Sequence, residues 1–479
     1  MRPRLPLHFL LCLLLCAGLG ACSPKQTANP APATALPEPL TLEHITTLTG
    51  KDICSPKSVI FSADGSRFYI NSLEGMKTVV FDAVTLQQLS VIEHSFGRDE
   101  APLFLNGESA AFDYRNASRR DEDELNCFEG KPVEFALTHS GRYLWVSYYR
   151  RSWDRYANFS SAVAVIDTLS GKIVRVIPTG PLPKMLAPSP DGSTMAVVHW
   201  GDNSIGLLNI ASSDPKDFAY TRLLVDGKRL PVSNLMGDRD AVCGYCLRGA
   251  AFSADSRYLF VGRMRNGGIT VFDVTTGERL GTFTDIAPTP RHIILSRDGR
   301  KLYVTSNHAG TLTELDVAEV IGCVKSGRAR ASRSRSLPVG KQARTLAQSP
   351  DGKYLFAACN LSTEIVAVDI AKWEVAASAQ TAPYTVGLAV SPRGDLAVTT
   401  SQGRGGQGGH AADVFRVHPP VVPDEAQLAE ERKAGAEAAR AESAGQTAAP
   451  VEVQAPAGEP AAPAEPPVPP ARGLDSAND

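Results

Sequence analysis

The sequence predicts an all-β protein built from seven copies of one unit. Three observations support this prediction: a β-hairpin pattern that recurs along most of the chain, intervals between copies that suit a four-stranded unit, and a shared pattern for the strand after the hairpin. At 479 residues the chain is long enough for two or three domains. One kind of unit throughout nevertheless favours a single large all-β domain.

The most complete copy of the unit lies at residues 291–317. An apolar run at 293–296, a turn at 297–300 and a stretch of alternating polar and apolar residues at 301–305 predict a hairpin. The Asp-Gly pair in the turn supplies the positive φ that a tight hairpin needs. A second turn leads to a third strand, which we expect to end at Val317 and to be followed by a turn.

The same hairpin occurs six more times. The copies are FSADGSRFYIN from Phe61, LTHSGRYLWVS from Leu137, PSPDGSTMAVV from Pro188, FSADSRYLFVG from Phe252, QSPDGKYLFAA from Gln348 and VSPRGDLAVTT from Val390. The shortest intervals between turn residues, from Ser256 to Gly299 and from Gly352 to Gly394, match the roughly 40–45 residues of a four-stranded propeller blade. The sequence therefore predicts a seven-bladed β-propeller over residues 40–418.

These motifs resemble the YVTN-type β-propeller repeat. The shared pattern is hydrophobic-Ser-Pro-Asp-Gly, then Lys/Arg-x-Leu-Tyr-Val-x-Asn, then Val-x-Val-(Ile/Phe)-Asp, and it is fullest at 293–317, 346–370 and 185–210. The resemblance covers about residues 40–417. It implies that the first strand of each blade lines a central channel and that the second strand returns. We expect 42–48 to supply the missing fourth strand of the last blade, which closes the ring.

The start of the chain predicts export. Arg2 and Arg4 precede a short apolar run at 9–15, which is too short to span a membrane. Leu-Gly-Ala-Cys at 19–22 is similar to a bacterial lipobox, in which the cysteine becomes the acylated first residue. We therefore expect a signal peptide over 1–21, with an ordinary signal peptide cut nearby as the alternative.

Both ends of the chain are expected to lie outside the repeat domain. Lipidation at Cys22 and a Pro/Ala-rich composition predict a lipidated flexible tether over 22–39, so a membrane is an expected partner. Ser23 favours the outer membrane of a bacterial cell envelope, on either its periplasmic or its surface side. Residues 419–479 are rich in Ala, Pro and Glu and predict a tail with a short helix followed by disorder.

The cysteines of an exported domain can form disulfides. Cys243-Gly-Tyr-Cys246 lacks the following histidine that covalent haem attachment needs, and no second pair stands at zinc-ribbon spacing. We expect a structural disulfide here, with redox-active thiols or a metal as alternatives. Cys54 and Cys127 precede the first strands of neighbouring blades, and we expect a link between them.

Positively charged residues recur just before the predicted first strands. They are Lys57, Lys184, Arg248, Arg291 with His292, and Arg344, while His199, Arg263 and His308 follow second strands. In the strand order that the resemblance implies, all of these residues lie at one mouth of the channel. Cations around a concave mouth favour an anionic ligand, and arginine suits carboxylate or phosphate. The alternative is that they satisfy carbonyls or acidic side chains of neighbouring loops.

Two long insertions also precede first strands. They lie between His94 and Pro132 and between Asp226 and Leu247, so we expect both on the same face as the cations. Insertions gathered on one face of a repeat protein mark a binding face. The leading hypothesis is a lipid-anchored, non-catalytic module that binds or scaffolds an envelope protein or binds an anionic small molecule.

The alternative hypothesis is an enzyme, either a lactonase-like hydrolase or a subunit of a periplasmic dehydrogenase. Acid–base catalysis needs polar groups at the mouth, and we find no carboxylate at the equivalent positions. No metal site or cofactor is expected from the motifs. The formal charge of −2 gives no reason to expect nucleic acid.

Overall fold

The computed structural model describes residues 39–104, 122–231, 237–328, 330–404 and 408–422. The predicted signal peptide, Cys22, almost all of the tether and most of the tail lie outside these residues. Among the described residues no helix is long and apolar enough to cross a membrane.

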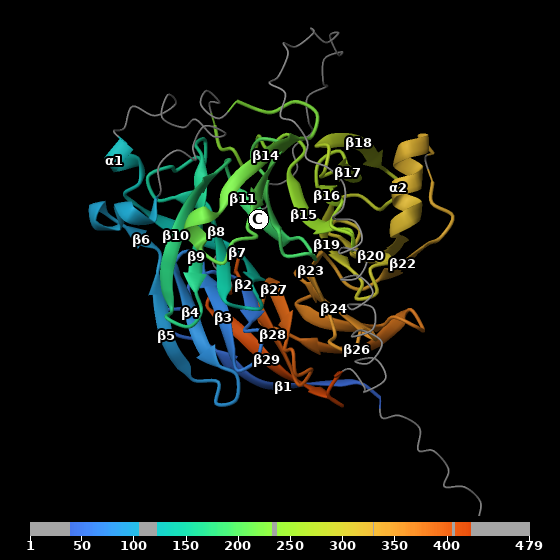
Figure 1. Ribbon diagram of the computed structural model, residues 1–479. Helices are drawn as coiled ribbons and strands as arrows, with labels where there is room; N and C mark the ends of the chain where they lie inside the picture. Colours follow the sequence, from blue (N-terminus) through green and yellow to red (C-terminus); the bar gives the residue numbers. More distant parts are fainter. Residues whose placement is uncertain (1–38, 105–121, 232–236, 329, 405–407, 423–479) are drawn as a thin grey trace, which may run out of the picture. The chain divides into compact units, whose positions relative to one another are not determined.

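The described strands form seven antiparallel sheets (Figure 1). Blade 1 contains β2 (Pro56–Phe61), β3 (Arg67–Ser72), β4 (Lys77–Asp82) and β5 (Gln88–Glu93). Blade 2 contains β7 (Phe128–Thr138), β8 (Tyr143–Arg151), β9 (Ser161–Asp167) and β10 (Lys172–Thr179), and the short β6 (Ser95–Phe96) pairs with β7. Blade 3 contains β11 (Pro183–Pro188), β12 (Thr194–His199), β13 (Ser204–Asn209) and β14 (Ala219–Val225).

The remaining blades repeat this plan. Blade 4 contains β15 (Leu247–Phe252), β16 (Tyr258–Arg263), β17 (Ile269–Asp273) and β18 (Glu278–Phe283). Blade 5 contains β19 (Pro290–Leu295), β20 (Lys301–Ser306), β21 (Thr311–Asp316) and β22 (Ser334–Pro338). Blade 6 contains β23 (Ala343–Gln348), β24 (Tyr354–Cys359), β25 (Glu364–Asp369) and β26 (Glu374–Gln380). Blade 7 contains β27 (Thr385–Val390), β28 (Leu396–Ser401), β29 (Ala411–His418) and β1 (Thr41–Leu48).

The first strands of successive blades contact one another and form a closed ring. β2 contacts β7, β7 contacts β11, and the series continues through β15, β19, β23 and β27 back to β2. The chain is therefore a seven-bladed β-propeller with its first strands innermost. β1 pairs with β29, with Leu42 opposite Val417 and Leu48 opposite Ala412, which confirms the expected closure by an N-terminal strand (Figure 1).

Apolar side chains between neighbouring blades hold the ring together. Phe61, Phe68 and Phe81 of blade 1, for example, pack in one cluster with Val398 and Val414 of blade 7. Burying one such side chain stabilises the fold by roughly 1.5–3 kcal/mol. Because both faces of a blade are covered in this way, strands such as β16 are buried along their whole length.

The helices of the described residues are short and lie between strands. They are η1 (Arg98–Leu103), α1 (Glu122–Leu125), η3 (Pro215–Asp217) and α2 (Val317–Ser326). The turn expected after the third strand of blade 5 is wrong, because β21 ends at Asp316 and α2 begins at once. Asp316 caps α2 by accepting the Glu319 N–H, and Gly327 ends it in the left-handed conformation. The helix buries Val320 and Cys323 against blades 4 and 5.

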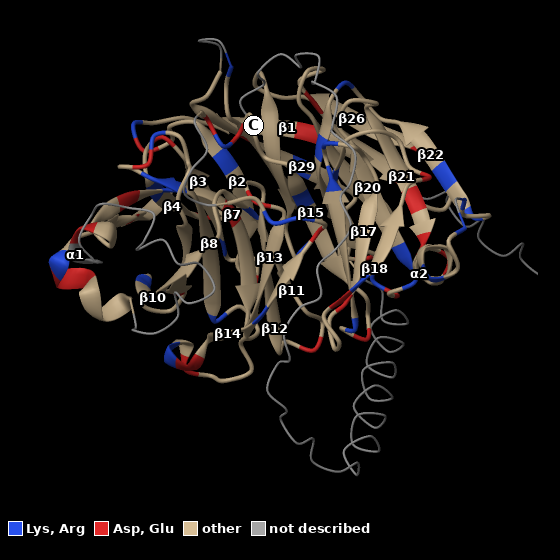
Figure 2. Ribbon diagram, turned by 90° about the horizontal axis from the view of Figure 1, so that it is seen from above, with Lys and Arg blue, Asp and Glu red and all other residues tan. Residues whose placement is uncertain are grey.

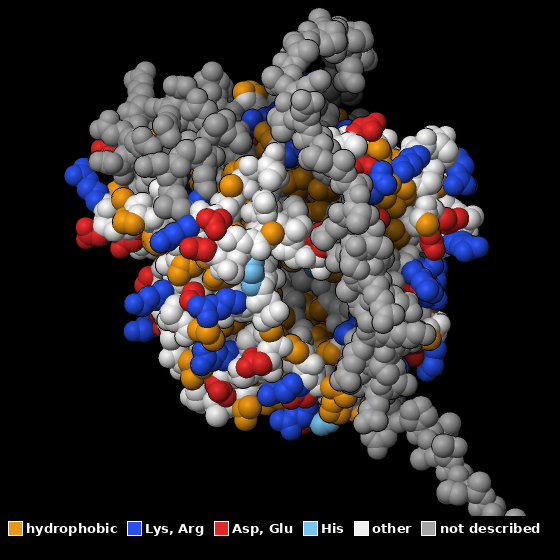
Figure 3. All heavy atoms as spheres, viewed as in Figure 1, with side chains coloured by type: hydrophobic (Ala, Val, Ile, Leu, Met, Phe, Trp, Pro, Cys, Tyr) orange, Lys and Arg blue, Asp and Glu red, His pale blue; other side chains and the backbone are white. Residues whose placement is uncertain are grey.

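Charged residues are interspersed on the propeller. Figure 2 shows acidic and basic residues of both signs mixed along the described strands and turns, in keeping with a formal charge of −2. In the view of Figure 3 the described charged side chains alternate with apolar ones around a recess near the middle. Electrostatic binding by the described residues therefore depends on local groups of side chains and not on one highly charged surface.

Candidate functional site

Every innermost strand has the same irregularity near its start. The pairing of the first and second strands shifts register there in all seven blades. The shift always spans the position eight residues before the turn residue of the hairpin, which we call the bulge position. A β-bulge bends the strand and redirects the side chain that it contains. The fold thus presents one redirected side chain per blade at the same level of the channel.

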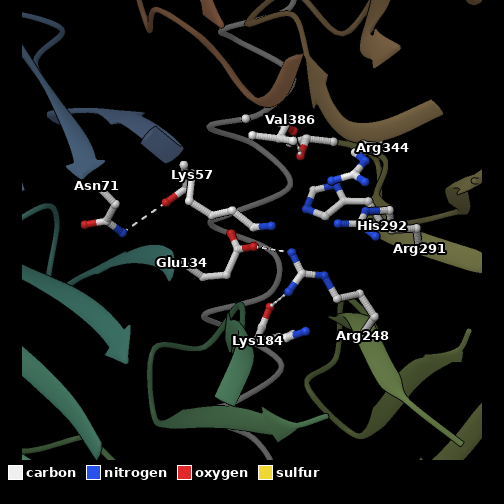
Figure 4. Close-up of polar contacts among 12 residues, drawn as sticks. Lys57, Asn71, Glu134, Lys184, Arg248, Arg291, His292, Arg344 and Val386 are labelled. Carbon is white, nitrogen blue, oxygen red and sulfur yellow. Dashed lines mark hydrogen bonds and ion pairs between the residues drawn. The ribbon is translucent and has the colours of Figure 1, made fainter. Parts of the chain in front are cut away.

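Five blades place a cation at the bulge position and two place a valine. We call these seven residues the collar: Lys57, Val133, Lys184, Arg248, Arg291, Arg344 and Val386. The five cations are all buried, with exposed fractions of 1% for Lys184 to 7% for Arg248. Figure 4 shows the labelled side chains extending from several blades towards a common centre.

An ion pair at the collar joins blade 4 to blade 2. Nη2 of Arg248 donates to Oε1 of Glu134 at 2.5 Å, and Nη1 donates to the backbone oxygen of Lys184 in blade 3 at 2.6 Å (Figure 4). Glu134 directly follows the bulge position of β7. No carboxylate occupies the bulge position in any blade, as expected, but Glu134 brings a carboxylate to the collar from the next position. Glu134 lies inside the register shift of β7, between Pro132 and Phe135, and its side chain meets the Arg248 side chain of the collar.

His292 directly follows Arg291 and faces the same centre (Figure 4). Its Nδ1 accepts the Leu346 N–H at 3.1 Å, so the neutral ring carries its hydrogen on Nε2. Burial, and then the charges of Arg248 and Arg291, lower the pKa of His292 to about 3. The ring is neutral at physiological pH, and two guanidinium groups contribute a positive potential at its position.

The two lysines of the collar make defined contacts with other segments. Lys57 Nζ donates to Oε1 of Gln402 at 2.8 Å. Lys184 Nζ lies 2.7 Å from Oδ1 of Asp240 and 4.1 Å from the ring centre of Trp200. Asp240 belongs to the insertion between blades 3 and 4, so this insertion reaches the collar.

Three predicted site residues lie outside the collar. His199 is fully buried in blade 3, where Nδ1 lies 2.9 Å from Ser204 Oγ, and burial lowers its pKa to about 4. Arg263 makes two hydrogen bonds with Asp226, at 2.6 and 2.5 Å. His308 is exposed in the turn between β20 and β21. The second strands therefore end at the same end of the blades as the collar, as expected. The side chains of His199 and Arg263, however, are buried within the protein.

The cysteines of the second insertion are joined. Cys243 and Cys246 form a disulfide, and both pack against Trp200 and Leu182. Cys54 and Cys127 form no link with each other. Cys127 lies three residues further from its hairpin than Cys54 does, or about 10 Å along an extended strand. A disulfide needs Cα atoms within about 7 Å, so this offset explains why the expected link is absent.

The described part of the chain contains no group of three or more His, Cys, Asp or Glu residues that could hold a metal ion. The collar and the residues that contact it offer guanidinium and ammonium groups, the imidazole of His292 and the carboxylates of Glu134 and Asp240. These groups bind ligands through charge-assisted hydrogen bonds.

Comparisons with known proteins support the fold. No family model matches the chain, and no curated protein matches it. Among solved structures, Kuenenia stuttgartiensis hydrazine synthase superposes with a TM-score of 0.52 at 15% identity, covering 76% of this chain and 96% of that one. The β-propeller domain of Myceliophteria thermophila Cps50 (Swd1) gives a TM-score of 0.51 at 13% identity, covering 78% and 99%. At such identities the likeness shows the β-propeller fold alone.

Proposed function

We propose that this protein is a lipid-anchored β-propeller of the bacterial cell envelope that binds an anionic group of a small molecule or a partner protein at its collar. The repeated bulge, with cations in five of seven blades, is the observation that carries the proposal. Val133 and Val386 occupy the same position in two blades, so the bulge itself does not require a charge. Cations gathered in a concave, partly desolvated site favour an anion.

One of the two insertions supports a binding role at the same end of the blades. The second insertion reaches the collar through Asp240, which contacts both Lys184 and Tyr149. The first insertion includes β6, η1 and α1, and β6 pairs with the start of β7 just before the collar. The described part of the first insertion packs on blade 2, where η1 contacts the outermost strand β10 (Figure 1). The second insertion is therefore the one that supports a binding face at the collar.

A titration of the purified full-length protein tests the binding proposal. A ligand that binds only the native state raises the melting temperature by mass action. Succinate, acetate and inorganic phosphate are the probes, and succinamide and acetamide are their uncharged controls. We expect at least one anion to raise the melting temperature while its control has no effect. The absence of any difference between the anions and the amides would refute an anion site.

Lipid anchoring is the part of the proposal that rests on sequence alone. The lipobox-like run at 19–22 supports it, and the YVTN-type motifs suit an exported propeller. We expect Cys22→Ala to leave the membrane fraction, whereas Cys54→Ala remains there. If Cys22→Ala still sediments with membranes and has the mass of the processed chain, the lipid anchor is wrong.

A hydrolase is a second candidate, and Glu134 is the observation that favours it. A carboxylate in a channel can act as a general base if it reaches a water molecule. Its ion pair with Arg248 opposes this role, because Oε1 already accepts a hydrogen bond from the guanidinium and not from a water molecule. Consumption of γ-butyrolactone by the wild type, lost in Glu134→Gln, would favour the hydrolase over the binding module.

A further inference from the structure

The collar and the residues beside it carry both signs of charge in different blades. Blades 5 and 6 contribute Arg291, His292 and Arg344, whereas blade 2 contributes Glu134. In a ring of seven, blade 2 stands opposite the boundary between blades 5 and 6. Figure 4 shows Glu134 and this group of three entering the centre from different sides.

The acidic side of the site retains capacity for a ligand. The contacts of the described residues use only Oε1 of Glu134, which accepts from Arg248. A carboxylate offers about four acceptor directions on its two oxygens. The Glu134 side chain is 19% exposed, more than the 8% of its partner Arg248. A further donor on a ligand can therefore approach Oε2.

The basic side of the site is arranged for a carboxylate. Nδ1 of His292 is engaged by Leu346, so Nε2–H is the donor directed elsewhere. Arg291 is the bulge residue of blade 5, which also contains His292, and Arg344 is the bulge residue of blade 6. Planar guanidinium groups match the geometry of a carboxylate.

The site thus presents three donor side chains on one side and the carboxylate of Glu134 on the other. We propose that the ligand is zwitterionic, with a carboxylate that binds Arg291, His292 and Arg344 and an ammonium group that binds Glu134. This inference rests on the proposed function and narrows its ligand to compounds of the amino acid type. The ion pair between Glu134 and Arg248 then orients the acidic group for the ammonium.

A series of ω-amino acids tests the inference on the full-length protein. The probes are glycine, β-alanine, 4-aminobutyrate and 6-aminohexanoate, each compared with its N-acetyl derivative, which keeps the carboxylate and loses the positive charge. We expect at least one amino acid to bind about ten times more tightly than its N-acetyl derivative, measured by calorimetry at pH 7.

Two variants show whether Glu134 causes this preference. In Glu134→Gln the ratio of the affinity for the amino acid to the affinity for its N-acetyl derivative should fall towards one. In Glu129→Gln the ratio should stay at its wild-type value, because Glu129 lies on the same strand but is exposed. If Glu134→Gln does not fold, the ratio of affinities in the wild type still shows whether the site prefers a zwitterion to a carboxylate alone.

The outcomes separate the inference from the proposed function. Binding of N-acetyl derivatives or succinate that is as tight as binding of the amino acids overturns the zwitterion but leaves the anion site. A wild-type preference that persists in Glu134→Gln overturns the role of Glu134. If no amino acid, carboxylate or phosphate binds, both the proposed function and the inference are overturned.

Discussion

The two ends of each blade differ in what they repeat. At the hairpin end five blades build the same turn, in which a serine Oγ donates to the aspartate two residues further along and accepts the N–H five residues further along. These serines are Ser62, Ser189, Ser253, Ser296 and Ser349. At the collar end all blades share the bulge, but the residue in it is Lys, Arg or Val.

This contrast separates residues that fold the chain from residues that can bind. The serine–aspartate turn needs particular side chains because their hydrogen bonds close the hairpin. The bulge is a property of the backbone and accepts side chains of different charge. The serine and aspartate of the hairpin therefore belong to the fold, whereas the bulge position can carry residues that bind.

Titration should distinguish the two ends, with the largest effect at the collar end. Burial lowers the pKa of His94 to about 3 and that of His199 to about 4, from an ordinary value of 6.5. Between these values and pH 6.5 the unfolded chain binds protons that the folded chain does not. The free energy of unfolding is therefore unaffected by these histidines above pH 6.5 and decreases as the pH falls below it. At pH 4 the decrease is on the order of 3 kcal/mol per histidine.

Denaturant unfolding at pH 7.5, 6 and 5 measures this loss. His94→Gln should show a shallower loss than the wild type, because one of the buried histidines that take up a proton on unfolding is removed. His308→Gln is the matched control, since His308 is exposed, and should behave like the wild type. The prediction is contradicted if His94→Gln and the wild type lose stability equally.

The hairpin end responds to acid in a different range. The hydrogen bond from Ser62, followed by the bond from the Ser66 backbone, lowers the pKa of Asp64 to about 2. For a carboxylate whose folded pKa is depressed, the stabilising contribution is present above pH 4 and disappears as the pH falls towards 2. Acid should therefore weaken the collar end first.

The second prediction concerns binding at the collar. Replacing Arg291 and Arg344 together by alanine should weaken the best carboxylate probe roughly 100-fold, because hydrogen bonds to charged groups contribute about 1.5–3 kcal/mol each. The matched control is Arg297→Ala with Arg300→Ala, at the hairpin end of blade 5, which should bind like the wild type. Calorimetry on both double variants measures the difference. Equal affinities would show that the collar arginines are structural.

Much of the fold follows from local patterns in the sequence. The hairpins are recognisable because their turn chemistry and their period of two are both local. The strand at 42–48 could be predicted because the last blade lacked a fourth strand. The cations at the bulge position were also visible, because they stand at a constant distance from each turn.

The rest depends on tertiary contacts or on ambiguous local chemistry. Glu134 could not be recognised as a neighbour of the collar, because its ion pair with Arg248 joins two blades and is not encoded by a local motif. The helix α2 was missed because Asp316 accepts the N–H three residues later, as Asp82 does from Thr85 in an ordinary turn. The inward orientation of His199 and Arg263 depends on their partners Ser204 and Asp226.

The smallest predicted effect concerns the hairpin end. Ser349→Ala removes a hydroxyl that donates to Asp351 at 2.5 Å and accepts the Tyr354 N–H at 2.9 Å. Because Ser349 is 1% exposed, the free energy of unfolding should fall by about 1–2 kcal/mol. The same change at Ser62, which is more exposed, should cost less because water replaces the lost bonds.

Carboxylate binding decides what these two variants mean. Both should keep wild-type affinity for the probe, since their hairpins lie at the opposite end of the blade from the collar. Chemical denaturation gives the stabilities and calorimetry gives the affinities. A loss of affinity in Ser349→Ala comparable to that of the collar variant would show that the two ends are coupled, and the division between repeated structural residues and variable binding residues would then fail.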